Sequence, residues 1–335
     1  MQSSMSFRRT LALLLTLVVT LGGCTAGSVR PESETEASST AGPPRDDDFI
    51  AMAMDETTDP EPPGGRPDVT AIGDTVLFLE STAYDVVYSE TKRNPLVVAY
   101  FLRQHTDQDF DPCNRPSRFL KDDRTAAKVV HDDFTGSGYD RGHMAPNQSI
   151  ATRHGCEAQR ETFLLSNIAP QLPDLNQRTW AAYEIVVDSV YADDFEGIWV
   201  LTGPIFDPEQ IVTMCDTEIE VPVEFWKVVI RRKPNDDLDA AAIVMKKDER
   251  RDRPIGEFST TIDDIEKRTG IDFFPDLPLA EEQAIESACP GDDWKLNQRL
   301  PPPHPGAPRD ICEEPPQARS PALQTEVGHS PVCAL

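Results

Sequence analysis

Positive charge is scarce in this chain. Its 335 residues hold 32 Lys and Arg against 58 Asp and Glu, which gives a formal net charge of −26. Proteins that bind nucleic acid usually present a basic surface that neutralises phosphates. The composition therefore argues against a nucleic-acid-binding protein of the usual basic kind. Binding of nucleic acid would require a locally basic region within the acidic chain.

Other familiar signatures are missing as well. The sequence has no glycine-rich phosphate-binding motif of the Rossmann or P-loop type and no internal repeat. Its seven cysteines do not show the close paired spacing of a zinc site. The apolar run Leu11–Leu21 is shorter than the about 20 residues that span a bilayer. These absences argue against a dinucleotide-binding fold, a structural zinc site and a membrane-spanning helix in that run.

The first 23 residues predict an export signal. Arg8 and Arg9 precede the apolar run, which ends in Leu-Gly-Gly-Cys24 and resembles a bacterial lipobox. We therefore expect cleavage before Cys24, lipidation of that cysteine, and an exported lipoprotein anchored on the periplasmic or cell-surface side of a membrane. An ordinary cleaved signal peptide and an uncleaved anchor are the alternatives.

Composition divides the remaining chain into three parts. Residues 24–68 are rich in Pro, Ser, Thr and acidic residues, and predict a disordered acidic linker behind the lipidated Cys24. Residues 69–289 are long enough to bury a full core and predict one domain. Residues 290–335 are proline-rich and predict a flexible tail.

Hydrophobic patterning predicts an α+β fold for residues 69–289, with a mixed or antiparallel sheet and helices. Helices are expected at about 174–192 and at 260–269, the second capped by Thr260 or Thr261. Apart from Cys24, six cysteines allow up to three disulfides, or some free thiols. The expected strands are 86–89, 96–102, 163–165, 197–202, 225–230 and 240–245, and the six cysteines are Cys113, Cys156, Cys215, Cys289, Cys312 and Cys333.

The segment Tyr139–Pro146 concentrates chemically active groups. Histidine exchanges a proton near neutral pH, and arginine offers a planar fork of donors that matches phosphate. With a metal ligand such as Asn176 nearby, these groups could cut a phosphodiester. The alternative is a strand-end turn that carries a structural histidine and a surface Asp–Arg pair.

Two segments in order resemble the DNA/RNA non-specific endonucleases with a ββα-metal site. They are SGYDRGHMAP at 137–146 and FLLSNIAPQLPDLNQRTWAAYE at 163–184, and the resemblance continues through most of 76–278. It implies a ββα-metal catalytic unit: a strand ending in His143, a second strand at 163–167 and a helix that begins near Asn176. It also implies hydrolysis of DNA and RNA with Mg²⁺, or alternatively Mn²⁺, leaving 5′-phosphate and 3′-hydroxyl ends.

The resemblance also gives individual residues their expected roles. His143 would be the general base and Asn176 the metal ligand, with waters completing the shell of the ion. Arg141 would hold the phosphate or steady the site. Arg118 would be the upstream arginine that contacts the scissile phosphate, with Arg115 as an equally close candidate.

Neighbouring residues are expected to support these groups. Asp140 would orient its neighbours, while Asn167 and Gln171 flank the site, Asn167 holding the His143 ring. Glu184 lies eight residues beyond Asn176, a rise of about 12 Å on the same helix stripe, and would act through water. The alternative interpretation of Glu184 is an ordinary glutamate on the solvent-exposed side of the helix.

Some residues also allow a purely structural interpretation. Asn176 could simply start a helix capped by Asp174, with Gln177 three residues further on. Trp180 is expected in the core, and His131 and His154 on the surface.

Charge is distributed unevenly in the predicted domain. Residues 115–160 hold eight Lys/Arg and six Asp/Glu, a net charge of +2, whereas the rest of residues 69–289 carries −20. We expect a small positive cleft in an acidic body, with affinity that depends on salt and metal, unless the acidity is an adaptation to salt. The rival functions are an inactive nucleic-acid-binding module of the same fold and a phosphodiesterase for another phosphate ester.

Overall fold

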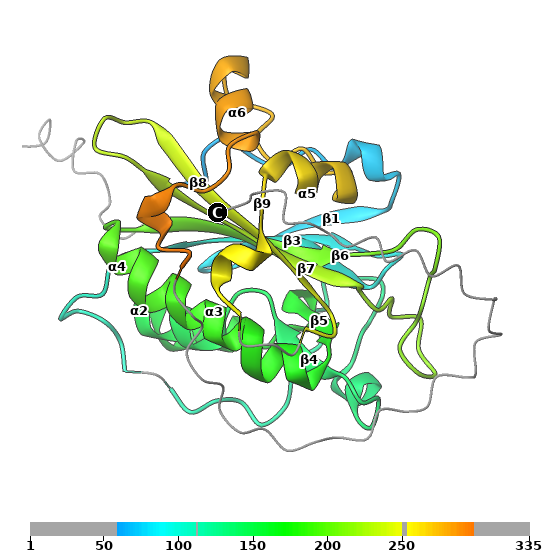
Figure 1. Cartoon of the computed structure of the whole chain (residues 1–335). Helices are drawn as coiled ribbons and strands as arrows, with labels where there is room; N and C mark the ends of the chain where they lie inside the picture. Colours follow the sequence, from blue (N-terminus) through cyan, green and yellow to red (C-terminus); the bar gives the residue numbers. More distant parts are fainter. Residues whose placement is uncertain (1–58, 112, 250–252, 298–335) are drawn as a thin grey trace, which may run out of the picture. The chain divides into compact units, whose positions relative to one another are not determined.

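A seven-stranded antiparallel sheet forms the centre of the fold (Figure 1). The computed structural model describes residues 59–297 except 112 and 250–252. The strand order is β1-β2-β3-β6-β7-β8-β9, and every neighbouring pair is antiparallel. The strands are β1 Val76–Glu80, β2 Tyr84–Ser89, β3 Asn94–Leu102, β6 Ile198–Ile205, β7 Glu224–Arg232, β8 Leu238–Lys246 and β9 Ser259–Thr260.

The central strands are apolar at successive positions because both faces of the sheet are covered. Side chains alternate between the faces along a strand. Val98 and Val200 belong to the hydrophobic cluster on one face, whereas Val97 and Leu201 belong to the cluster on the other. Every residue of β6 is buried. The sheet is therefore the middle of three layers.

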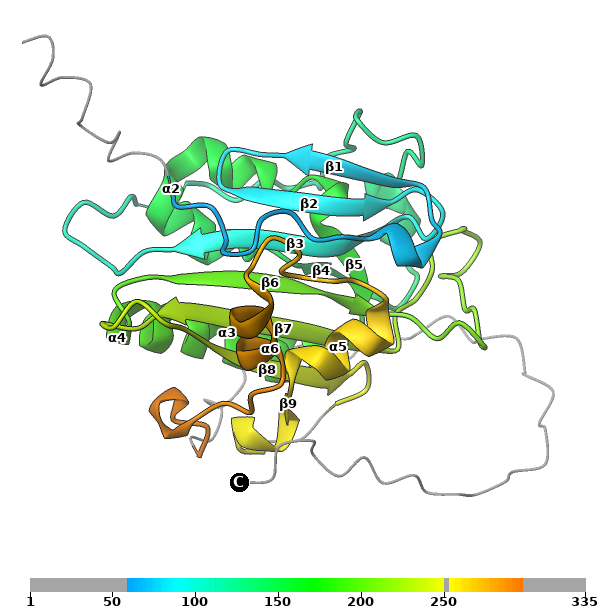
Figure 2. The same cartoon turned by 90° about the horizontal axis from the view of Figure 1, so that it is seen from above.

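Helices form the two outer layers (Figures 1 and 2). One face carries α2 Asn147–Glu161 and a long helix over residues 175–194, and the other carries α5 Ile262–Thr269 and α6 Leu279–Glu286. The long helix consists of a π-helical turn η4 Leu175–Trp180, then α3 Ala181–Val186, a second π turn η5 Val187–Tyr191 and α4 Ala192–Asp194. The 3₁₀ turns are η1 Thr70–Ile72, η2 His131–Phe134, η3 Leu165–Asn167, η6 Ile255–Phe258 and η7 Asp292–Trp294.

A separate two-stranded antiparallel sheet lies on the α3 side of the main sheet. It pairs β4 Asp140–His143 with β5 Ile168–Gln171 in an antiparallel register. Its two strands are connected through α2 rather than by a tight turn, and we call this pair the β4–β5 hairpin. A third hydrophobic cluster, which includes Phe134 and Ile168, packs beneath it. The hairpin thus fixes the chemically rich segment on a small element of its own.

The predicted α+β class with an antiparallel sheet is confirmed. The strands expected at 86–89, 96–102, 197–202, 225–230 and 240–245 are present, each within a longer strand. The strand expected at 163–165 is wrong, since this segment leads into η3 and makes a single bridge, from Leu164 to Leu120. Short apolar runs bury equally well in a turn, so their pattern alone does not identify a strand.

Both predicted helices are present, with one error at a cap. Thr261 caps α5 by accepting a hydrogen bond from the Asp264 amide at 3.2 Å, as expected. Asp174 makes no side-chain cap hydrogen bond, and instead pairs with Arg178 at 3.5 Å. The π-helical start explains the difference, because the capping pattern assumes α-helical geometry.

Contacts of the domain extend beyond the predicted limits of 69–289. The indole of Trp199 donates a hydrogen bond to the Pro60 carbonyl at 2.9 Å. Trp294 is fully buried, and its carbonyl accepts a hydrogen bond from the Tyr191 hydroxyl at 2.7 Å. No helix among the described residues is long and apolar enough to cross a membrane. The signal segment, Cys24, linker residues up to 58 and tail residues 298–335, with Cys312 and Cys333, lie outside the described residues.

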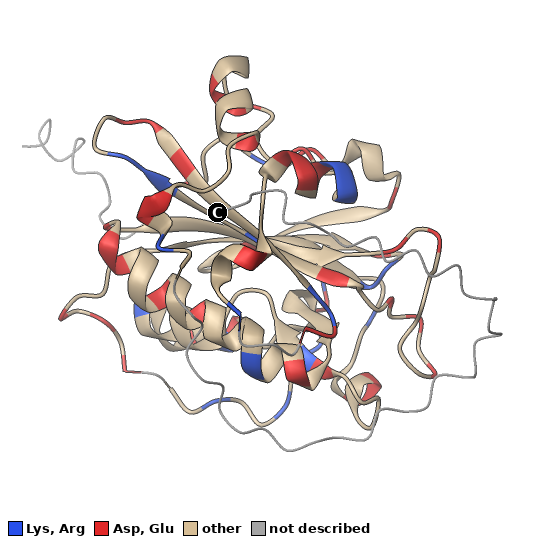
Figure 3. Ribbon diagram, viewed as in Figure 1, with Lys and Arg blue, Asp and Glu red and all other residues tan. Residues whose placement is uncertain are grey.

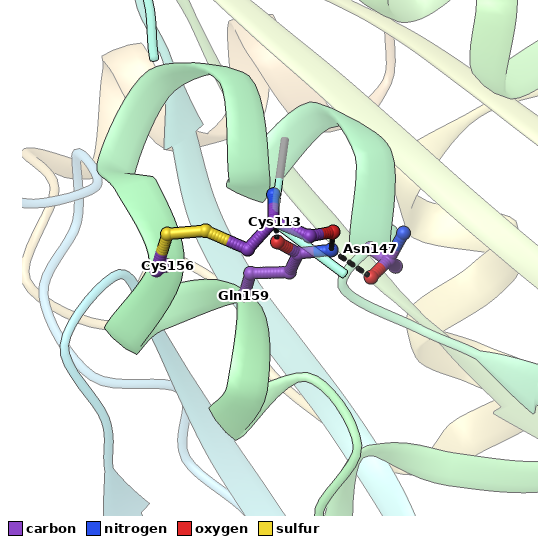
Figure 4. The surroundings of a disulfide bond; sticks show 4 residues. All are labelled: Cys113, Asn147, Cys156 and Gln159. Carbon is purple, nitrogen blue, oxygen red and sulfur yellow. Dashed lines mark hydrogen bonds between the residues drawn. A yellow bond between two sulfur atoms is a disulfide. The ribbon is translucent and has the colours of Figure 1, made fainter. Parts of the chain in front are cut away.

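A disulfide joins Cys113 to Cys156 of α2 (Figure 4). The side chain of Gln159 reinforces it by accepting from the Cys113 amide at 2.8 Å and donating to the Cys113 carbonyl at 3.2 Å. Cys215 and Cys289 are also disulfide-bonded. The prediction of structural bridges therefore holds for these four cysteines, and the first bridge anchors the segment that leads to Arg115.

Candidate active site

The DRGH segment forms strand β4 and is held by its pairing with β5. Asp140 lies opposite Gln171, and His143 lies opposite Ile168. Gln171 is fully buried and packs against Gly142 so closely that a Cβ at this glycine would lie 2.2 Å from its Oε1. Glycine is therefore required here for the two strands to pair while Gln171 stays inside.

His143, at the end of β4, packs against two aromatic rings that also contact each other. Its ring centroid is 5.2 Å from Phe119 and 5.2 Å from Phe163, the latter in an edge-on arrangement. Nε2 is buried and has no hydrogen-bond partner among the described residues. Burial, aided by the charge of Arg115, lowers the pKa of His143 to about 3. The imidazole is thus neutral at neutral pH, which is the form that can accept a proton.

Asn167 fixes the backbone just after His143. Its side chain accepts from the Ala145 amide at 2.8 Å and donates to the Ala145 carbonyl at 3.1 Å and the Thr162 carbonyl at 3.0 Å. The expectation that Asn167 ends the second strand and holds the imidazole ring is wrong, because it precedes β5 and contacts the main chain. Its effect on His143 is exerted through the position of residues 144–145.

Asp140 connects β4 to the start of the long helix. Its carboxylate accepts a hydrogen bond from Asn176 Nδ2 at 2.9 Å and another from Gln177 Nε2 at 2.6 Å. A carboxylate only accepts hydrogen bonds, so the amide of Asn176 turns its nitrogen to Asp140 and leaves Oδ1 for another group. Asp140 orients its neighbours, as expected, and the strand bearing His143 lies beside the helix turn bearing Asn176.

Arg141 braces the loop before the hairpin. Its guanidinium donates to the His131 carbonyl at 2.7 Å and the Thr135 hydroxyl at 2.9 Å, and it lies 5.7 Å from the centre of the Phe119 ring. His131 is half-buried, and its Nδ1 accepts from the Phe119 amide at 3.0 Å. His131, predicted on the surface, is partly exposed and also helps to place Phe119 against His143.

The two candidate upstream arginines have different surroundings. Arg118 is exposed, and its guanidinium is bonded to both carboxylate oxygens of Asp132 at 2.9 Å. Arg115 is also exposed, but its guanidinium lies 5.2 Å from the centre of the Phe163 ring, which contacts His143. Arg115 also contributes to the lowered pKa of His143. The structure therefore brings Arg115, rather than Arg118, to the histidine.

Glu184 pairs with a lysine that lies within the sheet. Lys227 of β7 is fully buried, and its Nζ is 3.8 Å from Glu184 Oε1, 3.4 Å from the Tyr100 hydroxyl and 4.7 Å from the centre of the Trp180 ring. Burial raises the pKa of Glu184 to about 7 and lowers that of Lys227 to about 8. Glu184 is therefore not the solvated helix glutamate of the alternative prediction, and Trp180 is a core residue, as expected.

The sequence profile of the DNA/RNA non-specific endonucleases matches residues 68–280, which include every residue of this site. The chain belongs to the DNA/RNA non-specific endonuclease family. The resemblance of the two motifs is thereby confirmed as family membership.

Individual relatives of this endonuclease-family chain are distant. It is similar to the mitochondrial nuclease EXOG of Homo sapiens, at 32% identity over 238 residues, which cover 64% of this chain and 61% of that protein. It is also similar to mitochondrial endonuclease G of Homo sapiens, at 30% identity over 223 residues, 62% of this chain and 73% of that protein. The match thus spans less than two thirds of the EXOG nucleases of Homo sapiens and Mus musculus.

The fold agrees with a solved member of the endonuclease family. The structure described as the EndoG/EndoGI complex, on the mechanism of EndoG inhibition, superposes with a TM-score of 0.54 at 25% identity. The superposition covers 60% of this chain and 86% of the other.

The residues at the endonuclease site fit a hard divalent cation held by few protein ligands. Asn176 presents a carbonyl oxygen, because Asp140 holds its amide nitrogen. Such ions accept oxygen ligands and retain several waters. Among residues 59–297 as described, groups of three carboxylates close enough to share an ion lie at α5 and α6 rather than at the β4–β5 hairpin.

Three residues of the site were missed from the sequence. Lys227 follows a tryptophan inside the apolar run VEFWKVVI, where a lysine in a buried strand is unusual enough to have been a signal. Phe119 and Phe163 could not be distinguished from ordinary core residues.

His154, predicted on the surface, is only 9% exposed in its side chain and pairs with Asp59 at 3.4 Å.

Proposed function

We propose that this protein is a sugar-non-specific endonuclease that hydrolyses phosphodiesters of DNA and RNA with Mg²⁺ or Mn²⁺. The observation that carries the proposal is the neutral His143 at the end of β4, joined through Asp140 to the helix turn that presents Asn176. Names of the relatives, nuclease EXOG and endonuclease G, support the same class of reaction.

His143 acts as the general base in this mechanism. The neutral imidazole takes a proton from a water molecule, whose oxygen attacks phosphorus in line. The bond from phosphorus to the 3′ oxygen breaks, and that oxygen leaves with a proton from solvent. The products carry 5′-phosphate and 3′-hydroxyl ends.

Asn176 Oδ1 would hold the divalent ion, and Glu184 would contribute through a water molecule. When bound, the ion supplies positive charge that stabilises the phosphate and the leaving 3′ oxygen. Asp140 holds the amide nitrogen of Asn176 at 2.9 Å, which leaves Oδ1 available to the ion. Lys227 keeps Glu184 close to its ionised form, since its charge opposes the rise that burial causes in the pKa of Glu184.

Digestion of plasmid DNA and of RNA by the full chain tests this function. We expect both substrates to be cut with Mg²⁺ and neither with EDTA. Asn176→Ala removes the proposed ligand, so its activity should require a higher Mg²⁺ concentration than that of the wild type. Exposed Asn235, which lies between β7 and β8, provides the control Asn235→Ala. Cleavage that is unchanged by EDTA would contradict the proposal.

Arg115, rather than Arg118, is the arginine we propose to contact the scissile phosphate. Its guanidinium lies against Phe163 beside His143, while Arg118 is engaged by Asp132. Arg115→Ala should lower kcat/KM by about 10²-fold or more, in the range of losing one donor to a developing negative charge. Arg118→Ala should change kcat/KM by less than about 10-fold. The reverse order in initial-rate measurements would return the role to Arg118.

We also propose that the protein is exported and lipid-anchored at Cys24. The support is the sequence of residues 1–24, with its basic start, apolar run and lipobox-like end. In a bacterial host, the wild type should fractionate with membranes and incorporate radioactive palmitate, whereas Cys24→Ser should do neither. Equal palmitate incorporation in both proteins would show that the anchor is elsewhere.

A further inference from the structure

Acidic residues occur along α5 and α6, on the face of the sheet opposite the β4–β5 hairpin (Figures 1 and 3), and their carboxylates form a cluster. One carboxylate oxygen from each of Asp263, Glu266 and Glu286 lies within 4.8 Å of the others. The same holds for Asp272, Glu282 and Glu286. Three segments therefore converge: α5, the loop after it, and α6, with Glu286 common to both groups.

Glu286 is the buried centre of this carboxylate cluster. The residue is only 6% exposed, and its Oε1 is buried with no hydrogen-bond partner among the described residues. A buried polar oxygen without a partner is costly, and a buried negative charge without a counter-charge is more so. This oxygen lies in a position that favours a cation.

Basic side chains do not supply that cation. In the described part of the chain, none of the five carboxylates forms an ion pair with Lys or Arg. Arg268 of α5 pairs with Glu224 and with Asp264, away from the cluster. Five carboxylates from three segments thus converge on the partnerless Glu286 oxygen with no basic side chain paired to any of them in the described part of the chain.

We propose that the carboxylate cluster is a Ca²⁺ site centred on Glu286, which links α6 to α5. The available ligands are all carboxylate oxygens, which suits a hard cation and does not suit zinc. Ca²⁺ accepts six to eight oxygens in irregular arrangements at about 2.3–2.6 Å, so opposed ligands lie up to about 5 Å apart. Mg²⁺ needs a smaller and more regular octahedron, which carboxylates from three separate segments are less suited to provide.

The site would act on stability rather than on chemistry. α5 and α6 contribute Ile262, Ile265 and Ile285 to the hydrophobic cluster on this face. A bound ion would link the two helices through their carboxylates. Because the sheet separates the cluster from the hairpin, this inference does not depend on the proposed nuclease function.

Calorimetric titration of Ca²⁺ into the EDTA-stripped, dialysed full chain tests the site, together with the melting temperature at each Ca²⁺ concentration. We expect Ca²⁺ to bind and to raise the melting temperature of both the wild type and Asn176→Ala. Glu286→Gln removes the shared carboxylate ligand at almost constant side-chain volume. The Kd of this variant for Ca²⁺ should be at least about 100-fold higher than that of the wild type, which exceeds the loss typical when a residue that only supports a ligand is replaced.

Two outcomes distinguish this site from alternatives. Without Ca²⁺, Glu286→Gln should melt at or above the temperature of the wild type, because Gln keeps the volume of the side chain and its amide can donate to the neighbouring carboxylates; this also shows that the variant folds. Absence of Ca²⁺ binding to the wild type would overturn the proposal. Equal Ca²⁺ stabilisation of the wild type and Glu286→Gln, with none in Asn176→Ala, would assign the ion to the hairpin site and overturn it as well.

Discussion

Replacing His143 by alanine should lower the rate of DNA and RNA cleavage by about 10³-fold, within the range that general-base catalysis contributes. The variant lacks the neutral imidazole that we propose as the general base. In the wild type this ring packs against Phe119 and Phe163 at the end of β4. Initial rates on plasmid DNA at saturating Mg²⁺ measure the effect.

His154→Gln is the matched control. His154 pairs with Asp59 and is partly buried, so its replacement tests whether any histidine loss lowers activity through the fold. We expect its rate to stay within about threefold of the wild type, an effect below 1 kcal/mol in activation free energy. Activity of His143→Ala within tenfold of the wild type, with an unchanged melting temperature, would eliminate His143 as the base.

The pH profile provides an independent check of His143. Because its pKa is lowered to about 3, the imidazole stays neutral from pH 5 upward, and its protonation should not produce an acid limb near pH 6.5. An acid limb near pH 7 would instead follow Glu184, whose pKa is raised to about 7. Glu184→Gln should remove that limb.

Replacing Lys227 by methionine should destabilise the protein by about 3 kcal/mol at pH 8, because it leaves Glu184 buried without its counter-charge. Burial raises the folded-state pKa of Glu184 above its value in the unfolded chain. The loss should therefore be small near pH 5, where the carboxyl is protonated in the folded variant, and grow as the pH rises through that raised pKa. Urea unfolding at several pH values measures it.

The double variant Lys227→Met/Glu184→Gln should recover most of that stability, since it removes both charges. Lys233→Met is the control: this lysine is 39% exposed and lies 3.8 Å from Asp239, so its loss should cost less than about 1 kcal/mol. A pH-independent loss in Lys227→Met would point to lost packing against Trp180 rather than to the unpaired carboxylate.

The sequence by itself determined the family and the class of fold. The DRGH segment and the segment around Asn176 are two short motifs, so their residue types are readable without contacts. Long apolar strands such as 225–230 were also found, because burial on both faces leaves a continuous hydrophobic run. Thr261 was found as a cap because its hydrogen bond is made within three residues.

Only the tertiary structure decided which side chains meet. Lys227 and Glu184 are 43 positions apart, and Asp140 and Asn176 are 36 positions apart, so no local pattern shows that they pair. Arg115 and Arg118 look equivalent in sequence, yet the chain directs one to Phe163 and the other to Asp132. The strand that pairs with β4 was predicted at 163–165 but lies at 168–171, because pairing with β4 rather than the apolar pattern decides its position. Sequence specifies the local chemistry and periodicity, whereas contacts between distant segments set burial, partners and pKa.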